Sequence, residues 1–506
     1  MPDTSIVEST SLKKARIPRS IPFIIGNEFS ERFSFYGMRS ILAIFLVHQF
    51  FNPHGLANLT NEAEAKSNAY THAFSTLVYF TPVLGGILAD WFFGKYRVIL
   101  IGSIIYTFGH FVLSIFDQSL PGFITGMMVI AFAAGAIKSC VSANVGDQFD
   151  HKNQHLMSSI YGWFYFSINA GSTVSILLIP VLYKNYGASV AFGVPGILMA
   201  LATVIFYSGN KRYVKVPPTG IKKDNFISIN FFVLRTYFSN KDKTKTAWQI
   251  AETKYGVQKV DAMKAVWRVM SVFAFIPIFW GMWDMNQSEW ALQADKLDLN
   301  LGIFGIKLLA SQVQAANAIF LLLMIPVFNY GVYPLVEKMG IKLTSLRKIG
   351  AGLFVTALSF VIIALLQRQV ELGMHPSVWW QIFAYLLLSA AEVMVSITGL
   401  EYAYTQSPPS MKSTMTAIWY LTYSVGTFFT TIINVGRSKG GLFYAFADNE
   451  KYFWLFVGIM LFFFVLFLLV SPRITEKAYL VEQHIGDGLD IKGDKTQEIH
   501  PDNPIV

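Results

Sequence analysis

Residues 20–49 read SIPFIIGNEFSERFSFYGMRSILAIFLVHQ, a run long enough to cross the roughly 30 Å hydrocarbon core of a bilayer as a helix. The run nevertheless contains four ionisable side chains and one tyrosine: Glu28, Glu31, Arg32, Tyr36 and Arg39. At about 100° per residue, these five side chains project into an arc of roughly 140°. An ionisable group near the bilayer centre costs about 2.5–3.5 kcal/mol on insertion scales, so it needs a partner, a wet cavity or a function. We therefore expect a membrane-spanning helix whose polar stripe faces the interior of the protein.

The composition of the whole chain agrees with a membrane protein. Of 506 residues, 53% are apolar and only 14% are charged, whereas soluble domains contain about a quarter charged residues. This balance, with a mean hydropathy of +0.45, argues against a water-soluble globule, a disordered chain and a fibrous repeat. The single cysteine, Cys140, excludes a disulfide framework. The polar, basic residues 1–19 do not resemble a cleavable signal peptide.

Twelve apolar segments are long enough to span a bilayer as helices. We expect them near residues 20–49, 68–93, 96–116, 121–148, 155–183, 187–207, 263–290, 311–338, 344–367, 377–405, 411–436 and 449–471. The chain thus predicts an all-α membrane protein with six crossings, a polar gap, and six further crossings.

The polar gap at residues 208–262 is strongly basic. It contains 11 Lys and Arg against 4 Asp and Glu, which accounts for +7 of the total net charge of +9. Loops rich in Lys and Arg stay in the cytoplasm and can lie against anionic headgroups, so the basic excess indicates topology and not a nucleic-acid partner. We expect a cytoplasmic linker, both termini inside the cell, and this division: segment 1–19, bundle 20–207, linker 208–262, bundle 263–471 and flexible tail 472–506.

Isolated charges occur within the other apolar segments of both halves. They are His72, Lys138, Arg268, Asp284 and Glu392. Charged groups inside a membrane protein usually face the bundle interior or a water-filled cavity, so their distribution predicts a shared central chamber. Lys138 and Glu392 have opposite signs and lie in opposite halves. A zwitterion with separated ends would satisfy both groups.

Two proton sites are open at this stage. His72 titrates near neutrality, although a single histidine near a helix end is more often an interfacial hydrogen-bonding group. Glu28 and Glu31 lie beside Arg32, and protonation of either carboxylate would free the guanidinium for a substrate carboxylate. The alternative interpretation is that the charges of this helix only neutralise one another and fix its packing.

Four sequence stretches resemble a known family. Residues 28–39 (EFSERFSFYGMR) resemble the ExxERFxYYG motif of the proton-coupled oligopeptide transporters (POT/PTR2), a branch of the major facilitator superfamily. Residues 85–95 (GGILADWFFGK), 164–171 (FYFSINAG) and 396–402 (SITGLEY) resemble further signatures of that family. The context of His72 and the pair Ile137-Lys138 are most similar to the mammalian-type carriers.

The resemblance implies a major facilitator fold of two pseudo-symmetric six-helix bundles that import di- and tripeptides with protons. Peptide-like drugs are further implied substrates, the functional unit is a monomer in the cell membrane, and the proton gradient replaces any cofactor. The implied substrate-binding residues are Arg32 and Lys138 for the peptide carboxylate, Glu392 for its amino end, and Tyr36, Arg39, Tyr79, Tyr165, Asn169, Trp280, Asn317 and Trp419 around them. The implied proton-coupling residues are Glu28, Glu31, Arg32 and His72, and the implied gating residues are Arg268 and Asp284.

The sequence departs from the family pattern at several positions. Phe35 replaces the first tyrosine of the motif, and Ser139 stands where proline usually follows the lysine. Asn329 occupies the place of an aspartate that pairs in mammalian-type carriers with the arginine matching Arg268, so a gate at Arg268 needs another partner here. The loop near residues 368–376 is short, which favours a bacterial source.

Three other functions stay open. The same scaffold in the wider family also carries nitrate, glucosides or drugs, although the joint presence of the acidic and basic site residues favours peptides. A receptor needs an output module larger than the linker or the tail. An enzyme needs a nucleophile with its base or a metal cluster, and the sequence has no Walker loop, no paired CxxC and no histidines at ligand spacing.

Overall fold

The computed structural model describes residues 16–474 except 53–59, 151–152, 154–155, 221–223, 240–244, 303–304 and 409–410. Most of the predicted N-terminal segment and nearly all of the predicted tail therefore lie outside the described residues. The described part is almost entirely helical, and its only β-type pairings are two isolated bridges, Asp298 with Ser377 and Asn300 with Lys307.

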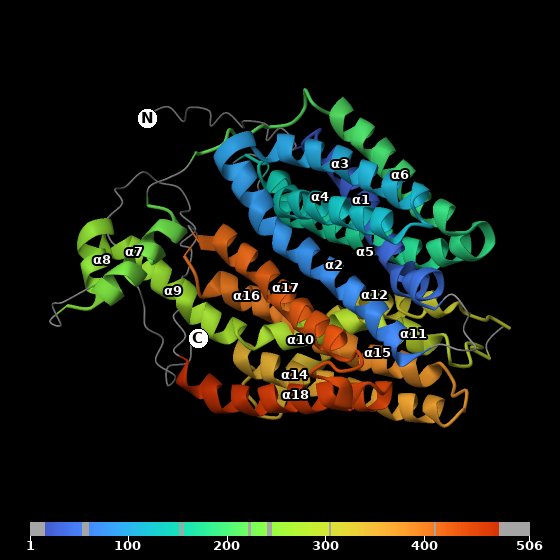
Figure 1. Ribbon diagram of the computed structural model, residues 1–506. Coiled ribbons are helices and arrows are strands. Elements are labelled where there is room, and N and C mark those ends of the chain that lie inside the picture. Colours follow the sequence, from blue (N-terminus) through green and yellow to red (C-terminus); the bar gives the residue numbers. More distant parts are fainter. Residues whose placement is uncertain are drawn as a thin grey trace, which may run out of the picture.

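The first half of the chain supplies six long helices, drawn blue to green in Figure 1. They are α1 (Ile21–Leu46), α2 (Asn61–Leu88), α3 (Lys95–Ile115), α4 (Leu120–Gly146), α5 (Met157–Tyr186) and α6 (Ala188–Ser208). The π-helical turns Val47–Phe51 and Ala89–Phe93 extend α1 and α2. Each of the first six predicted crossings thus corresponds to one helix.

The second half contains six further runs of helix, several of them broken. They comprise α9 (Val257–Phe273) with α10 (Ile276–Asp284) and α11 (Glu289–Ala294), α12 (Ala315–Val327) with α13 (Tyr333–Lys338), α14 (Ser345–Glu371), α15 (Trp379–Glu392) with α16 (Thr398–Thr405), α17 (Lys412–Gly436) and α18 (Asn449–Val470). The π-helical turns Phe328–Val332 and Val393–Ile397 join α12 to α13 and α15 to α16.

Length and composition identify nine spanning helices among the described residues, and a tenth if the bent pair of α9 and α10–α11 is one span. That pair bends by 51° at a break followed by Pro277 in the first turn of α10, a position where proline is tolerated because its missing N–H leaves no helical bond unmade. The polar α1 and α17 overlap the remaining two predicted crossings. The helices are therefore consistent with twelve crossings.

Glycines allow the closest helix contacts. A Cβ added to Gly426 of α17 would lie 2.0 Å from the backbone oxygen of Pro277 in α10, and one added to Gly171 of α5 would lie 2.6 Å from that of Phe29 in α1. Small residues at helix interfaces let backbones approach closely in membranes. These contacts bring the polar faces of α1, α5, α10 and α17 toward the centre of the molecule.

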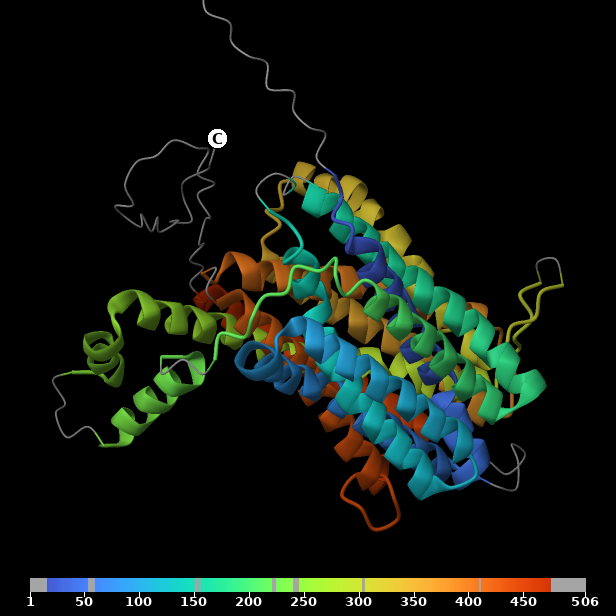
Figure 2. The ribbon, with the colours of Figure 1, turned by 90° about the horizontal axis from the view of Figure 1, so that it is seen from above.

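The helices of the linker lie at one end of the bundle. α7 (Phe226–Ser239) and α8 (Ala247–Tyr255) stand beyond the ends of the spanning helices in Figures 1 and 2. They share a small core around Ile229, Ala251 and Val260. We call this end of the bundle the linker end and the opposite end, which contains α11 and residues 295–301, the far end. The basic composition of this linker did not predict its helices.

Candidate functional site

A cavity lies between the two halves of the molecule. Its volume is about 210 Å³, many times the space that one water molecule needs. Helices α1, α2 and α5 line it from the first half, and α10, α12, α15 and α17 line it from the second. Nine of the residues predicted for substrate binding line this one cavity: Arg32, Tyr36, Tyr79, Tyr165, Asn169, Trp280, Asn317, Glu392 and Trp419.

The polar stripe of α1 forms the charged wall of the cavity in the first half. Arg32 Nε donates to Glu28 Oε1 at 2.7 Å and lies 3.3 Å from Glu31 Oε2. Glu28 and Glu31 are almost fully buried, whereas 14% of the Arg32 side chain is exposed. The guanidinium therefore lies between two buried carboxylates and the cavity.

Lys138 lies behind this wall and does not line the cavity. Its Nζ is 3.0 Å from Glu31 Oε1 and 4.2 Å from the centre of the Phe35 ring. An ammonium is attracted to the face of an aromatic ring, so the Phe35 ring, which does not line the cavity, helps to hold Lys138 behind the wall. Two cations and two carboxylates, Arg32 and Lys138 with Glu28 and Glu31, together make a neutral cluster in which Glu31 touches both cations.

Glu392 forms the acidic wall in the second half. Its Oε2 accepts hydrogen bonds from Trp283 Nε1 at 2.8 Å and from Asn317 Nδ2 at 3.0 Å. Asn317 Nδ2 is also 3.0 Å from Ser389 Oγ. Among the described residues, no Lys, Arg or His forms an ion pair with Glu392, and both of its hydrogen-bond partners are neutral. A buried carboxylate without a cation is costly, so this wall suits a cationic group of a ligand.

Aromatic rings form the rest of the wall. Tyr79 of α2 stacks on Tyr423 of α17 with ring centres 3.7 Å apart, and Trp280 packs edge-on against Trp419. Three aromatic residues that were not predicted from the sequence also line the cavity: Trp283, Tyr420 and Tyr423. In a chain with 15% aromatic residues, sequence alone does not distinguish rings that face lipid from rings that face a cavity.

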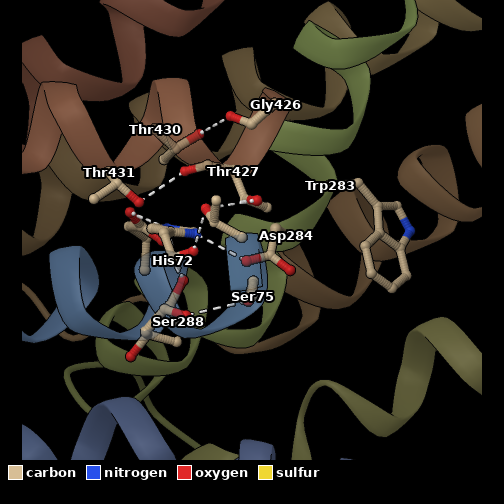
Figure 3. Close-up of polar contacts among 12 residues, drawn as sticks. His72, Ser75, Trp283, Asp284, Ser288, Gly426, Thr427, Thr430 and Thr431 are labelled. Atoms are coloured by element: carbon tan, nitrogen blue, oxygen red, sulfur yellow. Dashed lines mark hydrogen bonds and ion pairs between the residues drawn. The ribbon is translucent and has the colours of Figure 1, made fainter. Parts of the chain in front are cut away.

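A second charged cluster joins the two halves nearer the far end. His72 of α2 is fully buried, and its Nδ1 lies 2.8 Å from Asp284 Oδ2 of α10; Figure 3 shows these two side chains together, with Ser288 beside His72. Arg39 Nη2 donates to Asp284 Oδ1 at 2.9 Å, and Tyr423 Oη donates to the same oxygen at 2.5 Å. Arg39, which was expected at the substrate, is therefore enclosed in this cluster and does not line the cavity.

Glu289 completes this cluster, and the sequence analysis did not single it out. Its Oε2 lies 2.9 Å from His72 Nε2. Its Oε1 accepts from Tyr452 Oη at 2.8 Å and from Asn434 Nδ2 at 3.1 Å. The available signal was a second acid five residues after Asp284 in a segment otherwise expected to cross the membrane.

Further polar contacts between the halves also lie toward the far end. Lys296 forms an ion pair with Glu64 at the start of α2, and Asn449 at the start of α18 contacts the same carboxylate. Arg268, the second predicted gating residue, lies instead in α9 on the linker side of the bend. Arg268 and Asp284 therefore belong to different ends of the bundle.

Comparisons with known proteins identify relatives of this chain. The sequence model of the POT family (PTR2) matches residues 96–439. Solute carrier family 15 member 2 of Mus musculus is 34% identical over 402 residues, covering 76% of this chain and 54% of that protein. Peptide transporter 3 of Caenorhabditis elegans is 36% identical over 388 residues, covering 72% and 53%. The chain thus spans about half the length of the curated relatives it matches.

A solved structure shares the architecture. The crystal structure of the POT family transporter PepTSo matches with a TM-score of 0.83 and 35% identity, covering 91% of this chain and 99% of that one. This similarity confirms the fold class predicted from the sequence.

Proposed function

The chain belongs to the POT family, and from this premise we propose that it is a proton-coupled symporter that imports di- and tripeptides by alternating access. It is a multi-pass membrane protein. The observation that carries the proposal is the cavity with a guanidinium, Arg32, on one wall and, on the other, a carboxylate, Glu392, that has no cationic partner within the described part of the chain.

A short peptide matches the two walls of the cavity. At neutral pH it has a carboxylate at one end and an ammonium at the other, separated by a polar backbone. We assign the carboxylate to the exposed part of Arg32 and the ammonium to Glu392, both of which line the cavity. The side-chain amides of Asn169 and Asn317 line the space between and provide donors and acceptors for the backbone. Such recognition depends on features common to all short peptides, so we expect broad side-chain tolerance and acceptance of peptide-like drugs.

The α1 cluster links the peptide to a proton. Glu28 and Glu31 hold Arg32 in the described state, and Glu31 also holds Lys138. Protonation of Glu31 removes one carboxylate from both cations, so a peptide carboxylate can replace it. Release of the proton restores the internal ion pairs and expels the peptide carboxylate. Lys138 in this account acts on the peptide through Glu31 and the field of the cluster.

The described contacts favour a state that is closed at the far end. Hydrogen bonds and ion pairs join the spanning halves from Thr76 with Thr427 near the middle through the His72 cluster to Glu64 with Lys296. With the linker and both termini in the cytoplasm, as the basic residues favour, the far end is extracellular and this state faces inward. We place the protein in the cell membrane, where one chain suffices because both walls of the cavity belong to it.

Transport into proteoliposomes tests the proposal. A membrane potential of 100 mV supplies about 2.3 kcal/mol per proton, which corresponds to roughly 50-fold accumulation of a neutral solute. We expect labelled dialanine to accumulate when an inward proton gradient is imposed and an uncoupler to abolish accumulation. Uptake unaffected by the uncoupler, or absent without ATP, contradicts the proposal. If nitrate or a glucoside inhibits the uptake and unlabelled peptides do not, the protein carries a solute other than peptides.

A further inference from the structure

We propose that Glu289 is a proton-coupling residue: with Asp284 it holds His72 as an imidazolium that bridges the two halves and keeps the far end closed. This inference rests on the proposed symport and adds a carboxylate that neither the sequence motifs nor the family resemblance identified. His72 belongs to the first half, and both carboxylates belong to the second.

The contacts of His72 with both carboxylates depend on how many hydrogens its ring carries. Both ring nitrogens of His72 face carboxylate oxygens, Nδ1 toward Asp284 at 2.8 Å and Nε2 toward Glu289 at 2.9 Å. A neutral imidazole has one N–H and can donate to only one of them, whereas the imidazolium donates to both. Two ionised carboxylates therefore require one extra proton on the ring, and without it one nitrogen lone pair faces a carboxylate.

The surroundings of the two carboxylates differ. Asp284 also receives Arg39 Nη2 at 2.9 Å and the hydroxyl of Tyr423, so a cation stays with it whether or not His72 is protonated. Besides His72, the described donors to Glu289 are neutral: the hydroxyls of Ser288 and Tyr452 and the amide of Asn434.

A further cation, Arg437, lies on the other side of Tyr452 and Asn434. Its guanidinium is 4.0 Å from the centre of the Tyr452 ring and donates to Asn449 and to Asn434 Oδ1, so neutral side chains separate it from Glu289. Among the described residues, the cationic contact of Glu289 is therefore His72 alone. With an imidazolium, the group of Arg39, His72, Asp284 and Glu289 is neutral; with an imidazole it carries one buried negative charge that no cation in the group contacts on the Glu289 side.

Because the two carboxylates differ in their surroundings, loss of the proton weakens the contact of His72 with Glu289 more than it affects Asp284. When the proton leaves, the link between His72 and Glu289 loses both its hydrogen bond and its charge attraction, while Asp284 keeps Arg39. The far end then opens most readily at α11, which contains Glu289. Proton binding from outside restores the bridge and closes that end. An importer needs this order, because it closes to the outside when loaded and reopens after the proton has left inside.

The test compares Glu289→Gln with Tyr452→Phe. The first substitution removes the charge next to His72, whereas the second removes one hydrogen bond to the same carboxylate and leaves every charge in place. Potential-driven uptake of dialanine in proteoliposomes is measured against external pH, and peptide counterflow at equal pH reports whether the variant is folded and binds. We expect Glu289→Gln to move the midpoint of the pH profile to lower pH by about one unit or more, and Tyr452→Phe to leave it within about 0.3 unit.

A second measurement does not depend on transport. Nitrogen-15 NMR of histidine-labelled protein, with the His72 signal assigned by loss in His72→Gln, reports whether both ring nitrogens carry hydrogen. We expect the doubly protonated ring in the wild type and the neutral ring in Glu289→Gln at the same near-neutral pH. A neutral ring in the wild type, or equal pH midpoints for wild type and Glu289→Gln, overturns the inference. Wild-type uptake that ignores the proton gradient overturns the proposed symport instead.

Discussion

Glu392→Gln tests the proposed ammonium site most directly. The substitution keeps the size of the side chain, and its amide oxygen can still accept hydrogen bonds from Trp283 or Asn317, which contact the carboxylate at 2.8 and 3.0 Å. What it removes is the negative charge that lines the cavity. Removing one partner of a buried, hydrogen-bonded charge pair costs about 2–5 kcal/mol. The lower figure corresponds to roughly a 30-fold loss of affinity.

The assay compares two ligands that differ only in their amino end. Dialanine carries the ammonium, and N-acetyl-dialanine does not. Competition against a labelled tripeptide in proteoliposomes should show that Glu392→Gln weakens dialanine by about 30-fold or more. N-acetyl-dialanine should change by less than about threefold, because it places no cation against residue 392. Glu401→Gln, an exposed acid nine residues further on in α16, is the matched control and should alter neither ligand. Equal losses for both ligands would refute the role assigned to Glu392.

Two further predictions concern stability and are measured by thermal unfolding in detergent. Lys138→Met should lower the free energy of unfolding by about 3 kcal/mol because it leaves Glu31 with one cation fewer in a buried site. The double variant Lys138→Met with Glu31→Gln should recover most of that loss. If the effects of the two substitutions simply add, the two side chains are not coupled. Gly426→Ala should lower the free energy of unfolding by about 3 kcal/mol or more because its Cβ would lie 2.0 Å from a backbone oxygen of α10. The control Gly458→Ala, whose added Cβ would have no atom within 4 Å, should have little effect. Equal melting temperatures for the two variants would show that α10 and α17 separate easily.

The charged residues in apolar segments were the features that sequence predicted best. The cost of placing a charge in a bilayer is independent of detailed packing, so Arg32 and Glu392 were expected in one chamber before their neighbours were known. Their separation in the chain, 360 positions, did not weaken that expectation. The cavity that both residues line agrees with it.

What the sequence did not predict depends on helix rotation and breaks. Arg39 lies two turns along α1 from Arg32, and a shift of a few tens of degrees decides whether it reaches the cavity or Asp284. Lys138 was placed at the substrate because its pairing with Glu31 could not be seen from single-helix periodicity. The linker helix α8 did carry a local signal, the capping box of Thr246 with Gln249, which the basic composition obscured.

The proposed ammonium site at Glu392 and the His72 cluster are connected through adjacent residues of α10. Trp283 donates to Glu392 in the cavity, and Asp284 binds His72 at the interface between the halves. Consecutive residues of a helix point about 100° apart, so one rigid turn reaches both places. A movement of α10 that separates Asp284 from His72 therefore also moves the indole that holds Glu392. In the proposed mechanism, opening of the far end and a change in the ammonium site are then parts of one displacement, which would couple the proton on His72 to the peptide without any direct contact between them.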